Sequence, residues 1–377
     1  MKHLKAGVIG MGFMGYAHVE ALRRLGTVEV AAIVSGSGAQ KRAEALNVPQ
    51  YYEDYREMIL HAGIDAVHIC TPNGTHYEIA KFALEHGVHV LCEKPFTVTM
   101  EEAEALCLLA EKTKLQNAVN FHNRFYPMAN TIRCLNRDGA FGEIVAVQGS
   151  YLQDYMIHDT TYSWRLDAAN GKTRVIGDIG SHWMDLAEFV SLHKIVAVQA
   201  LFKTLYPVRK VPLHPAATFS KSEKDAEYRE VPVTTEDMAC VMFRFDNGAI
   251  GSMMLSQVFP GKKNELKMLV SGTQQSAEWN SEDCCNLTIG NADLPNQLIP
   301  KNPAQAYPGT ETMISYPVGH TEGYPDAFKQ CFRQFYASIT EPEDVYDFAT
   351  FEDGLRSTIL AERIYESAKS QSWVSVC

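Results

Sequence analysis

The chain has 377 residues, enough for two domains with sizeable cores, and its 46% hydrophobic and 21% charged residues are typical of a soluble globular protein. The formal net charge of −11 argues against general binding to nucleic acid or to an anionic membrane. No stretch approaches the roughly 18 apolar residues that would predict a membrane-spanning helix. The nine cysteines show neither metal-ligand nor disulfide-scaffold spacing. We therefore expect a reduced, cytoplasmic protein with no metal site.

The first element is a short apolar strand over 6–9, followed by a glycine-rich turn and a helical pattern that runs to about Leu25. Strand, Gly-x-Gly-x-x-Gly turn and helix in this order are typical of a dinucleotide-binding fold. The first glycine allows the tight turn, the second lets a pyrophosphate approach the backbone, and the third lets helix and strand pack closely. A purely structural turn is the weaker alternative. The expected cofactor contacts here are Gly10, Gly12, Phe13, Met14 and Gly15.

The second strand, 28–34, should end beside the adenosine ribose of the cofactor. Sites for NAD usually carry Asp or Glu at this point, but here the chain has Ser35, Gly36 and Ser37, and the next helix brings Lys41 and Arg42. Hydroxyls and cations suit a 2′-phosphate, so the sequence slightly favours NADP over NAD. The alternative is that Lys41 and Arg42 only form a solvated helix face.

The next strands end at the same edge of the predicted sheet. A strand over 64–70 leads into Thr71, Pro72 and Asn73, which we expect beside the cofactor. His76, in the first turn of the following helix, fits a cofactor contact or a local cap equally well. The strand that begins at Val88 ends on Glu93-Lys94-Pro95, and Pro95 restricts Lys94 to a stiff corner that faces the ligand crevice. We expect Glu93 and Lys94 to contact the cofactor there.

A helix over 100–112 and a strand over 116–121 complete an alternating pattern of strands and helices. This pattern predicts an α/β domain with a doubly wound parallel sheet of the Rossmann type over 1–123. From 124 to 377 we expect an α+β domain with an open, mostly antiparallel sheet. Its strands are predicted over 142–154, 195–205, 237–245, 249–258, 266–271 and 275–279, with helices over 127–137, 324–339 and 348–370 and long loops over 206–235 and 281–320.

A helix in the second half begins near Gly177. Asp178 and His182 are four residues apart, so they share one face of that helix, and Asp185 could orient the imidazole of His182. An aspartate near the positive end of a helix is also ordinary capping, and the pattern alone favours capping and core packing.

Taken together, these motifs resemble the glucose–fructose oxidoreductase/inositol dehydrogenase (Gfo/Idh/MocA) family. The matching residues are Gly10–Gly15, Thr71-Pro-Asn73 with His76, Glu93-Lys-Pro95, and Asp178-x-x-x-His182. The resemblance implies that Lys94, Asp178 and His182 form the catalytic group. The family's Gly-Gly pair before the Asp is replaced here by Arg174-Val-Ile176, so the shape of that loop does not carry over.

The resemblance also implies an NAD(P)-dependent dehydrogenase acting on a secondary hydroxyl of a sugar, cyclitol or sugar derivative. In this interpretation His182 is the base, because the free pKa of His lies near neutrality, and Lys94 polarises the oxygen. Polar and aromatic residues near these motifs are the candidate substrate contacts, together with Lys94, Asp178 and His182. They are Arg124, Tyr126, Asp154, Tyr155, Trp164 and Arg165.

Two other functions share these motifs. Some relatives cleave glycosidic bonds with NAD by oxidation and elimination, and others bind the cofactor as sensors without turnover. Retention of Lys94, Asp178 and His182 argues against a sensor. We also expect a homodimer or homotetramer through the second sheet, because a large apolar sheet face is rarely left exposed.

Overall fold

The computed structural model describes residues 3–167, 170–213, 227–342 and 344–376. The chain divides into two units, one formed by 1–125 with 324–358 and the other by 126–323 with 359–377. Residues 324–358 thus group with the nucleotide-binding segment, whereas the sequence placed everything from 124 onward in the second domain.

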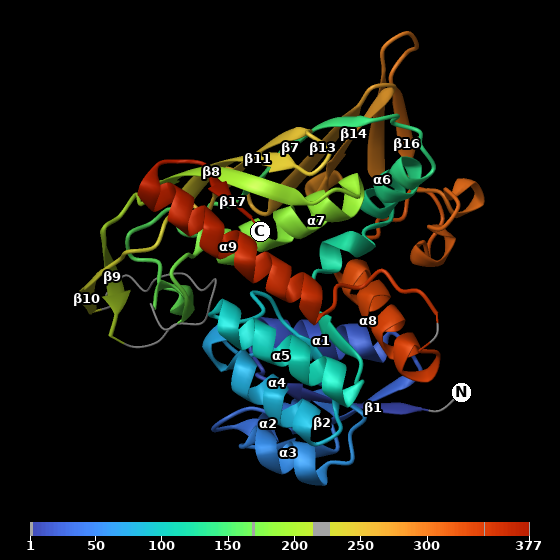
Figure 1. The fold of residues 1–377 in the computed structure, drawn as a ribbon. Coiled ribbons are helices and arrows are strands. Elements are labelled where there is room, and N and C mark those ends of the chain that lie inside the picture. The colour runs from blue at the N-terminus through green and yellow to red at the C-terminus, as the bar shows by residue number, and fades with distance from the viewer. Residues whose placement is uncertain (1–2, 168–169, 214–226, 343, 377) are drawn as a thin grey trace. The chain divides into compact units, whose positions relative to one another are not determined.

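In the described part of the first unit, six parallel strands form a sheet in the order β3-β2-β1-β4-β5-β6, drawn from blue to teal in Figure 1. The strands are β1 (Leu4–Ile9), β2 (Val28–Val34), β3 (Gln50–Tyr52), β4 (Ala66–Ile69), β5 (His89–Cys92) and β6 (Asn117–Val119). The helices between them are α1 (Phe13–Arg23), α2 (Ala39–Leu46), α3 (Tyr55–His61), α4 (His76–Glu85) and α5 (Met100–Thr113). The expected Rossmann-type sheet is confirmed.

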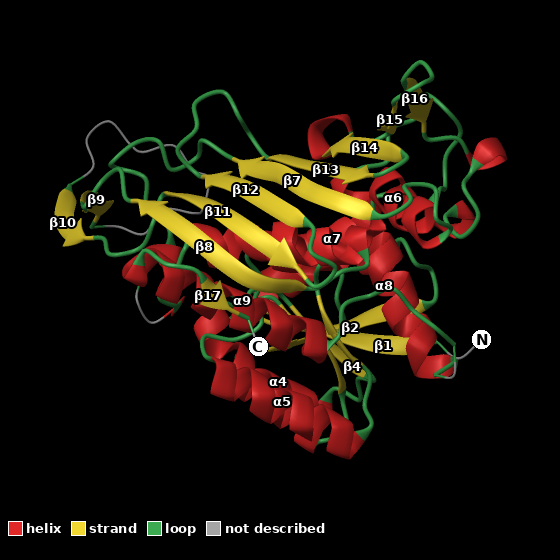
Figure 2. Ribbon diagram, turned by 45° about the horizontal axis from the view of Figure 1, so that its top comes forward, coloured by secondary structure: helices red, strands yellow, loops and turns green. Residues whose placement is uncertain are grey.

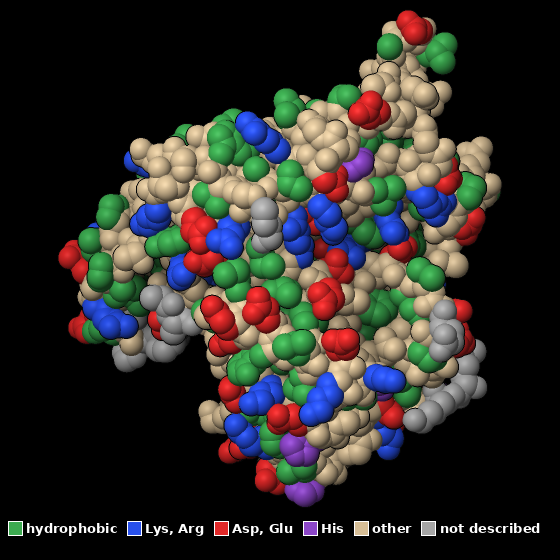
Figure 3. Space-filling model, viewed as in Figure 1, with side chains coloured by type: hydrophobic (Ala, Val, Ile, Leu, Met, Phe, Trp, Pro, Cys, Tyr) green, Lys and Arg blue, Asp and Glu red, His purple; other side chains and the backbone are tan. Residues whose placement is uncertain are grey.

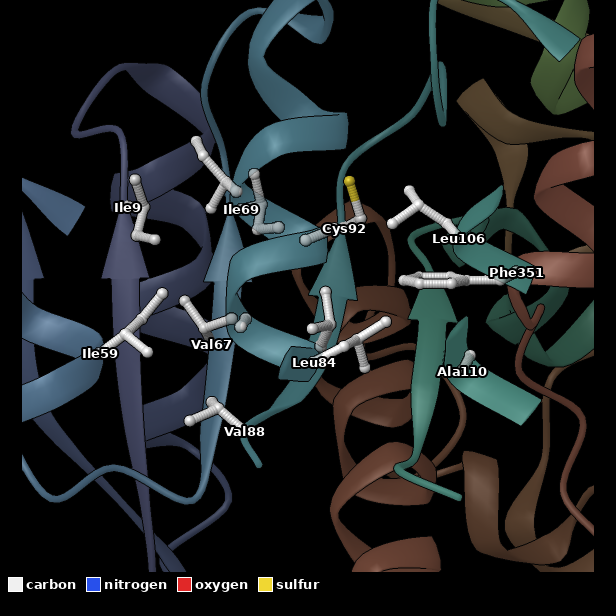
Figure 4. Packing of buried hydrophobic residues seen from close by; sticks show 14 of the residues in the cluster. Ile9, Ile59, Val67, Ile69, Leu84, Val88, Cys92, Leu106, Ala110 and Phe351 are labelled. Atoms are coloured by element: carbon white, nitrogen blue, oxygen red, sulfur yellow. The ribbon is translucent and has the colours of Figure 1, made fainter. Parts of the chain in front are cut away.

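One face of this sheet is closed by a continuous apolar core. Val67 and Ile69 on β4 pack with Leu84 of α4 and Leu106 of α5, and Phe351 from the distant end of the chain joins the same cluster (Figure 4). Because successive side chains of a strand point to opposite faces, His68 between Val67 and Ile69 lies on the other face. That face is covered by α1 and by α8 (Tyr324–Thr340).

In the second unit, nine described strands form a mixed, mostly antiparallel sheet in the order β16-β15-β14-β13-β7-β12-β11-β8-β17, in which only β7 and β12 run parallel. This confirms the predicted open sheet. Its strands are β7 (Ile144–Leu152), β8 (Ile195–Lys203), β11 (Met238–Phe245), β12 (Ile250–Ser256), β13 (Glu265–Gly272), β14 (Gln275–Asn280), β15 (Asn286–Asn291), β16 (Gln297–Pro300) and β17 (Val374–Ser375). The turn Asp246-Asn-Gly248, a typical hairpin sequence, connects β11 to β12, and Gly248 has the positive φ of 89° that such a turn favours.

Helices α6 (Pro127–Arg137) and α7 (Ser181–Ser191) pack on one face of this sheet, and Figure 2 shows the opposite face bare. The final helix, α9 (Phe351–Ser370), is continuous from the first unit into the second, where Ser367 Oγ accepts a hydrogen bond of 3.0 Å from the Ala200 amide on β8.

The two long loops predicted over 206–235 and 281–320 are wrong in part, because both contain strands. β9 (Val208–Pro212) and β10 (Tyr228–Pro232) form a separate antiparallel pair, while β15 and β16 extend the large sheet. Leu287 and Ile289 alternate into the core of β15, a signal that polar neighbours obscure in the sequence. Residues 214–226 of the first predicted loop lie outside the described residues.

On the face drawn in Figure 3, Lys and Arg side chains lie interspersed with Asp and Glu. Within the described residues, no helix is both long enough and apolar enough to span a bilayer.

Candidate active site

The glycine-rich turn between β1 and α1 has the geometry that a pyrophosphate needs. Gly10 has φ of +93°, and a Cβ there would lie 2.8 Å from the backbone of Cys70. A Cβ on Gly15 would lie 2.2 Å from the Gly10 carbonyl oxygen, whereas one on Gly12 would meet nothing within 4 Å. The turn is therefore tight at both ends and open in the middle, where the free amides at the start of α1 can receive phosphate oxygens.

The two residues between the second and third glycines lie beside the start of α8. The Phe13 side chain is 59% exposed and stacks on Tyr324 with ring centroids 6.5 Å apart. The Tyr324 hydroxyl lies 3.6 Å from the sulfur of Met14. Tyr324 therefore packs beside the phosphate-binding turn, a contact that the sequence did not predict.

The end of β2 carries hydroxyls and cations, as the sequence suggested. Ser35 is half-buried and Ser37 is exposed, and Arg42 Nη1 donates a 3.1 Å hydrogen bond to the Ser37 carbonyl. Gly36 and Lys41 are exposed to solvent. A guanidinium is thus held against the turn where the ribose of a dinucleotide would lie.

His76 joins two neighbouring strand ends. Its Nε2 lies 2.9 Å from the Thr71 carbonyl, and its Nδ1 lies 3.0 Å from the carbonyl of Pro95. Burial lowers the pKa of His76, while these carbonyls and Glu93 act in the opposite direction. The ring thereby positions the Thr71 turn relative to the Lys94-Pro95 corner. Pro72 remains exposed, and Asn73 is buried at the start of a short 3₁₀ turn.

Glu93 is held as a buried carboxylate at the end of β5. Its Oε1 accepts hydrogen bonds from His18 Nε2 at 2.8 Å and from Asn120 Nδ2 at 2.6 Å. Burial alone would raise the pKa of Glu93, but the hydrogen bond and charge of His18, the charge of Lys94 and the Asn120 hydrogen bond lower it to about 2. The other oxygen, Oε2, accepts the Lys94 amide at 3.3 Å. The Lys94-Pro95 peptide is cis, and the Lys94 side chain is half-buried.

The hydrogen-bond chain continues behind Glu93. His18 Nδ1 lies 2.9 Å from His68 Nδ1, and His68 Nε2 lies 2.9 Å from the Tyr336 hydroxyl on α8. Burial and the neighbouring His18 keep the pKa of His68 well below its ordinary value, so His68 is neutral. Tyr336, His68, His18 and Glu93 thus form one continuous chain of buried polar contacts, in which both nitrogens of each imidazole have a partner.

In the second unit, a buried carboxylate shapes the start of the helix predicted to carry chemistry. Residues Ile176–Gly180 form a π-helical turn, and α7 begins only at Ser181, so the predicted α-helix from Gly177 is wrong over its first turn. Glu236 accepts hydrogen bonds from the amides of Arg174 (3.0 Å) and Ile176 (2.9 Å). These amides lie before the start of α7. The carboxylate that caps them belongs to Glu236, about 60 positions away in the chain.

Asp178 lies in this π turn and is the centre of a polar cluster. Its Oδ1 forms an ion pair of 3.0 Å with Arg165 Nε, and its Oδ2 accepts a 2.7 Å hydrogen bond from Gln257 Nε2. Tyr155 lies in the same cluster, where burial and the charge of Asp178 raise its pKa to about 12 against opposing arginines. The Arg165 guanidinium also stacks 4.4 Å over the ring of Trp164. Asp178, Arg165, Tyr155 and Trp164, four of the candidate substrate contacts named from the sequence, thus lie in one cluster.

His182 is fixed by the packing of its neighbour. Trp183 is fully buried, donates a 3.0 Å hydrogen bond to the Lys267 carbonyl and stacks on Phe243. A Cβ on Gly149 of β7 would lie 2.7 Å from Trp183 Nε1, so the glycine is what lets α7 approach the sheet. His182 itself is 4% exposed, and its ring lies 6.4 Å from that of Tyr151, the β7 residue two positions beyond Gly149.

Three predicted substrate residues have other contacts. The Asp154 carboxylate accepts the Gly261 amide at 3.0 Å and Lys263 Nζ at 2.6 Å. Arg124 forms a 3.1 Å ion pair with Asp353 in the first unit. Tyr126 packs on Trp279 with centroids 5.0 Å apart, inside the second unit.

Sequence reasoning missed several polar residues that complete the site. His18, His68 and Asn120 are fully buried around Glu93, and Gln257 is fully buried at Asp178. A histidine inside the apolar run Ala66-Val-His-Ile69 was a usable signal, because a buried polar side chain needs a partner. Gln257 follows the end of β12, where a polar residue is common, so nothing in the sequence indicated its role.

Comparison with known proteins agrees with this geometry. Residues 4–121 match a family model described as an oxidoreductase family with an NAD-binding Rossmann fold, and residues 129–278 match the GFO/IDH/MocA C-terminal domain. A levoglucosan dehydrogenase of Pseudarthrobacter phenanthrenivorans is 29% identical over 392 residues, covering 100% of this chain and 99% of the relative. A D-glucoside 3-dehydrogenase of Escherichia coli is 30% identical over 50% of this chain and 54% of its own length.

Among solved structures, a levoglucosan dehydrogenase in complex with NADH and L-sorbose superimposes with a TM-score of 0.90 and 28% identity, over 100% of both chains. The open cradle at Gly12 fits the pyrophosphate of such a dinucleotide. The expectation of a nicotinamide-dependent dehydrogenase is thereby confirmed, and the chain belongs to the Gfo/Idh/MocA family of oxidoreductases with an NAD-binding Rossmann fold.

Proposed function

We propose that this chain oxidises a secondary hydroxyl of a sugar, cyclitol or sugar derivative with NAD or NADP. The observation that carries the substrate class is the Asp178 cluster, in which a buried carboxylate lies with a guanidinium, an amide and a phenol. Such a set offers both donors and acceptors, which vicinal hydroxyls need and a lipid does not. Relatives named as levoglucosan and D-glucoside 3-dehydrogenases support the same class.

The proposed roles follow from the chemistry of each side chain. When bound, the nicotinamide supplies the hydride acceptor. His182 accepts the hydroxyl proton as general base, and the Lys94 ammonium stabilises the negative charge that develops on the oxygen. Asp178 accepts a hydrogen bond from a substrate hydroxyl. That these three residues act on one substrate rests on the family resemblance and on their retention here.

For the cofactor, we propose that NADP binds at least as tightly as NAD. Arg42, anchored on the Ser37 carbonyl, places a cation at the end of β2, and Ser35 supplies a hydroxyl where a carboxylate would repel a 2′-phosphate. The glycines and the turns at Thr71 and Glu93 would hold the rest of the molecule.

We also propose that the chain forms a homodimer or homotetramer in the cytoplasm. The bare face of the large sheet exposes Leu201 on β8, Met242 on β11 and Ile250 on β12, to 67%, 48% and 65% respectively. Side chains that alternate along neighbouring strands place them on the same face, and a second copy of this face would cover them.

The direct test is an absorbance screen at the nicotinamide band, with NAD and NADP and a panel of anhydrosugars, glucosides and cyclitols. We expect net NADH or NADPH formation with one subclass of the panel. Glycosidic cleavage without a net absorbance change would instead identify the oxidation–elimination chemistry, and cofactor binding without any conversion would identify a sensor.

On the best substrate, His182→Ala should lower turnover by about 100-fold or more, the usual range for a lost general base. Lys94→Ala should be at least as severe, and the double variant should lose far less than the product of the single losses, because residues that act as a unit are not additive. Cofactor dissociation constants, measured by fluorescence titration, should change little. If His182→Ala retains near-normal turnover, His158 and Tyr162 become the next candidates for the base.

A further inference from the structure

Two adjacent cysteines in the second unit form a sulfur site with its own hydrogen-bond partners. Cys284 is buried and Cys285 half-buried, between the 3₁₀ turn Ser281–Asp283 and β15. The Cys284 sulfur lies 3.1 Å from the Glu322 carbonyl oxygen, to which its S–H can donate. The Glu322 amide donates in turn to the Cys285 sulfur at 3.3 Å. One backbone segment is thus bonded to both sulfurs.

That segment is held rigidly by buried charge. Lys301 and Glu322 form an ion pair and are 2% and 0% exposed, and Lys301 Nζ also donates to the Tyr316 carbonyl at 2.9 Å. The Glu322 carboxylate accepts the amide of Ser315 at 2.8 Å as well. Because the Glu322 side chain is fixed at several points, its own N–H stays directed at the Cys285 sulfur.

The charged and titratable groups that face the two sulfurs determine which of them ionises. Cys284, Lys301 and Glu322 face Cys285, and Asp283 faces Cys284. The neighbouring Cys284 thiol is the main cause that lowers the pKa of Cys285, against the effect of burial, and the Glu322 amide at 3.3 Å and the charge of Lys301 act in the same direction; the contact between the two thiols raises the pKa of Cys284. Cys285 therefore ionises first, and Cys284 remains the thiol.

We propose that Cys285 is a nucleophilic thiolate that forms mixed disulfides with low-molecular-weight disulfides. The Cys285 sulfur attacks one sulfur of the reagent R–S–S–R, the reagent's S–S bond breaks, and a Cys285–S–S–R bond forms while R–S⁻ leaves. The reagent supplies the oxidising equivalents, so no other co-reactant is needed. The site is a modification site separate from the Asp178 cluster and independent of the proposed sugar oxidation.

The backbone favours this product over a bond between the two cysteines. Consecutive Cα atoms are about 3.8 Å apart, whereas disulfides usually join Cα atoms about 4.4–6.8 Å apart. An internal Cys284–Cys285 bridge would therefore require backbone movement in a segment that the Lys301–Glu322 pair fixes. The mixed disulfide should accumulate.

N-acetylcysteine added to the labelling reaction is the reference thiol, because the exposed Cys240 lies beside Leu201 on the sheet face that a second copy of the chain would cover. Cys70 is half-buried, and burial and the charge of Glu93 raise its pKa well above the ordinary value, so it should react slowly.

The test is labelling of the full chain with 4,4′-dithiodipyridine, followed by peptide mapping by mass spectrometry from pH 6 to pH 9. Exposure and intrinsic nucleophilicity do not change with pH, so the ratio of the two labelling rates follows the ratio of thiolate fractions. We expect the ratio of Cys285 labelling to N-acetylcysteine labelling to fall at least about tenfold from pH 6 to pH 9, because an ordinary thiol is almost entirely protonated at pH 6. A ratio that does not change with pH would overturn the proposal.

Two variants separate the activating contacts from simple accessibility. Cys284→Ser keeps a hydroxyl donor and should preserve the pH dependence, whereas Cys284→Ala should flatten it while leaving labelling at pH 9 intact. In the unmodified chain, Cys285 should carry one pyridylthio group. Release of two thiopyridone equivalents with loss of two protons from the 284–285 peptide would show an internal bridge and contradict the proposed product.

Discussion

The Arg165–Asp178 ion pair makes the sharpest prediction at the scale of single residues. Arg165→Met removes the cation but retains much of the side-chain volume, so Asp178 loses its 3.0 Å partner and its fixed orientation. Removal of one partner of a largely buried ion pair costs about 2 kcal/mol or more, which corresponds to roughly a tenfold or larger increase in KM for the sugar. Steady-state kinetics on the best substrate measures the change.

Arg137→Met is the matched control, because Arg137 forms a similar pair with Asp138 at 2.9 Å on the surface of the same unit. It should leave KM unchanged. Equal effects of the two substitutions would mean that Arg165 has no special relation to substrate.

Ser35 provides the test of cofactor choice. Ser35→Asp places a carboxylate at the end of β2, where it would repel a 2′-phosphate and accept hydrogen bonds from a ribose hydroxyl. We expect NADP affinity to fall about tenfold or more, the effect of roughly 1.4 kcal/mol, while NAD affinity holds or improves. Ser35→Asn introduces a side chain of the same shape as Asp but without its charge, and it should leave NADP affinity nearly unchanged. Titration showing that the unmodified chain clearly prefers NAD would overturn the proposal.

The sequence predicted the roles of those residues whose function depends only on the elements directly before and after them in the chain. The roles of Gly10 and Gly15 follow from strand, turn and helix in sequence, and the structure shows the close approaches that exclude a Cβ at both. Gln257 and Glu236 could not be predicted, because their importance depends on Asp178 and Arg174, which lie far away in the chain. Glu93 was predicted to touch the cofactor, yet its partners His18 and Asn120 are visible only in three dimensions.

Among the elements, the 3₁₀ turn at His122–Phe125 makes the fold sensitive to acid. His122 packs edge-on against Tyr324 and at a tilt against Phe328, with centroids 5.1 and 4.2 Å away, and burial is the main cause that lowers its pKa to about 3. The unfolded chain would bind a proton at about pH 6.5. The contribution of neutral His122 to stability is therefore complete above pH 6.5 and is lost as the pH falls from 6.5 toward 3.

His122→Phe keeps an aromatic ring in the stack and removes the titration. Between pH 6 and pH 4, the free energy of unfolding of the variant should fall less steeply than that of the unmodified chain, by up to about 1.4 kcal/mol per pH unit. Urea denaturation at several pH values measures both slopes. Parallel curves would show that His122 is not buried as a neutral ring.

Element boundaries show where sequence patterns lose their power. The start of the helix over Pro127–Arg137 was predicted at Pro127 and its end at about Arg137, because proline favours the first position of a helix. The π turn at Ile176–Gly180 was not, since Glu236 fixes the preceding amides from another part of the sheet. β15 and β16 were missed because each is a short strand whose place is decided by its partner, β14 or β15.

For the whole molecule, assembly is the property to measure. Leu201→Glu together with Met242→Glu would place two carboxylates on the bare face of the large sheet, where burial of unpaired charge is strongly unfavourable. We expect light scattering to show a dimer or tetramer for the unmodified chain at micromolar concentration and a smaller species for the variant. Leu108→Glu is the control, because Leu108 on α5 is also 67% exposed but lies in the first unit. A monomeric unmodified chain would contradict the proposed assembly.

The return of residues 324–358 to the first unit has a consequence for biosynthesis. Ala349 and Phe351 complete the core formed by β4, β5, α4 and α5, and Phe328 and Phe332 cover His18 on the opposite face. The ribosome makes these residues only after the whole of 126–323. The nucleotide-binding sheet, although first to emerge, must therefore wait with an unfinished core while the second unit is synthesised, and it exposes apolar surface that chaperones recognise throughout that interval.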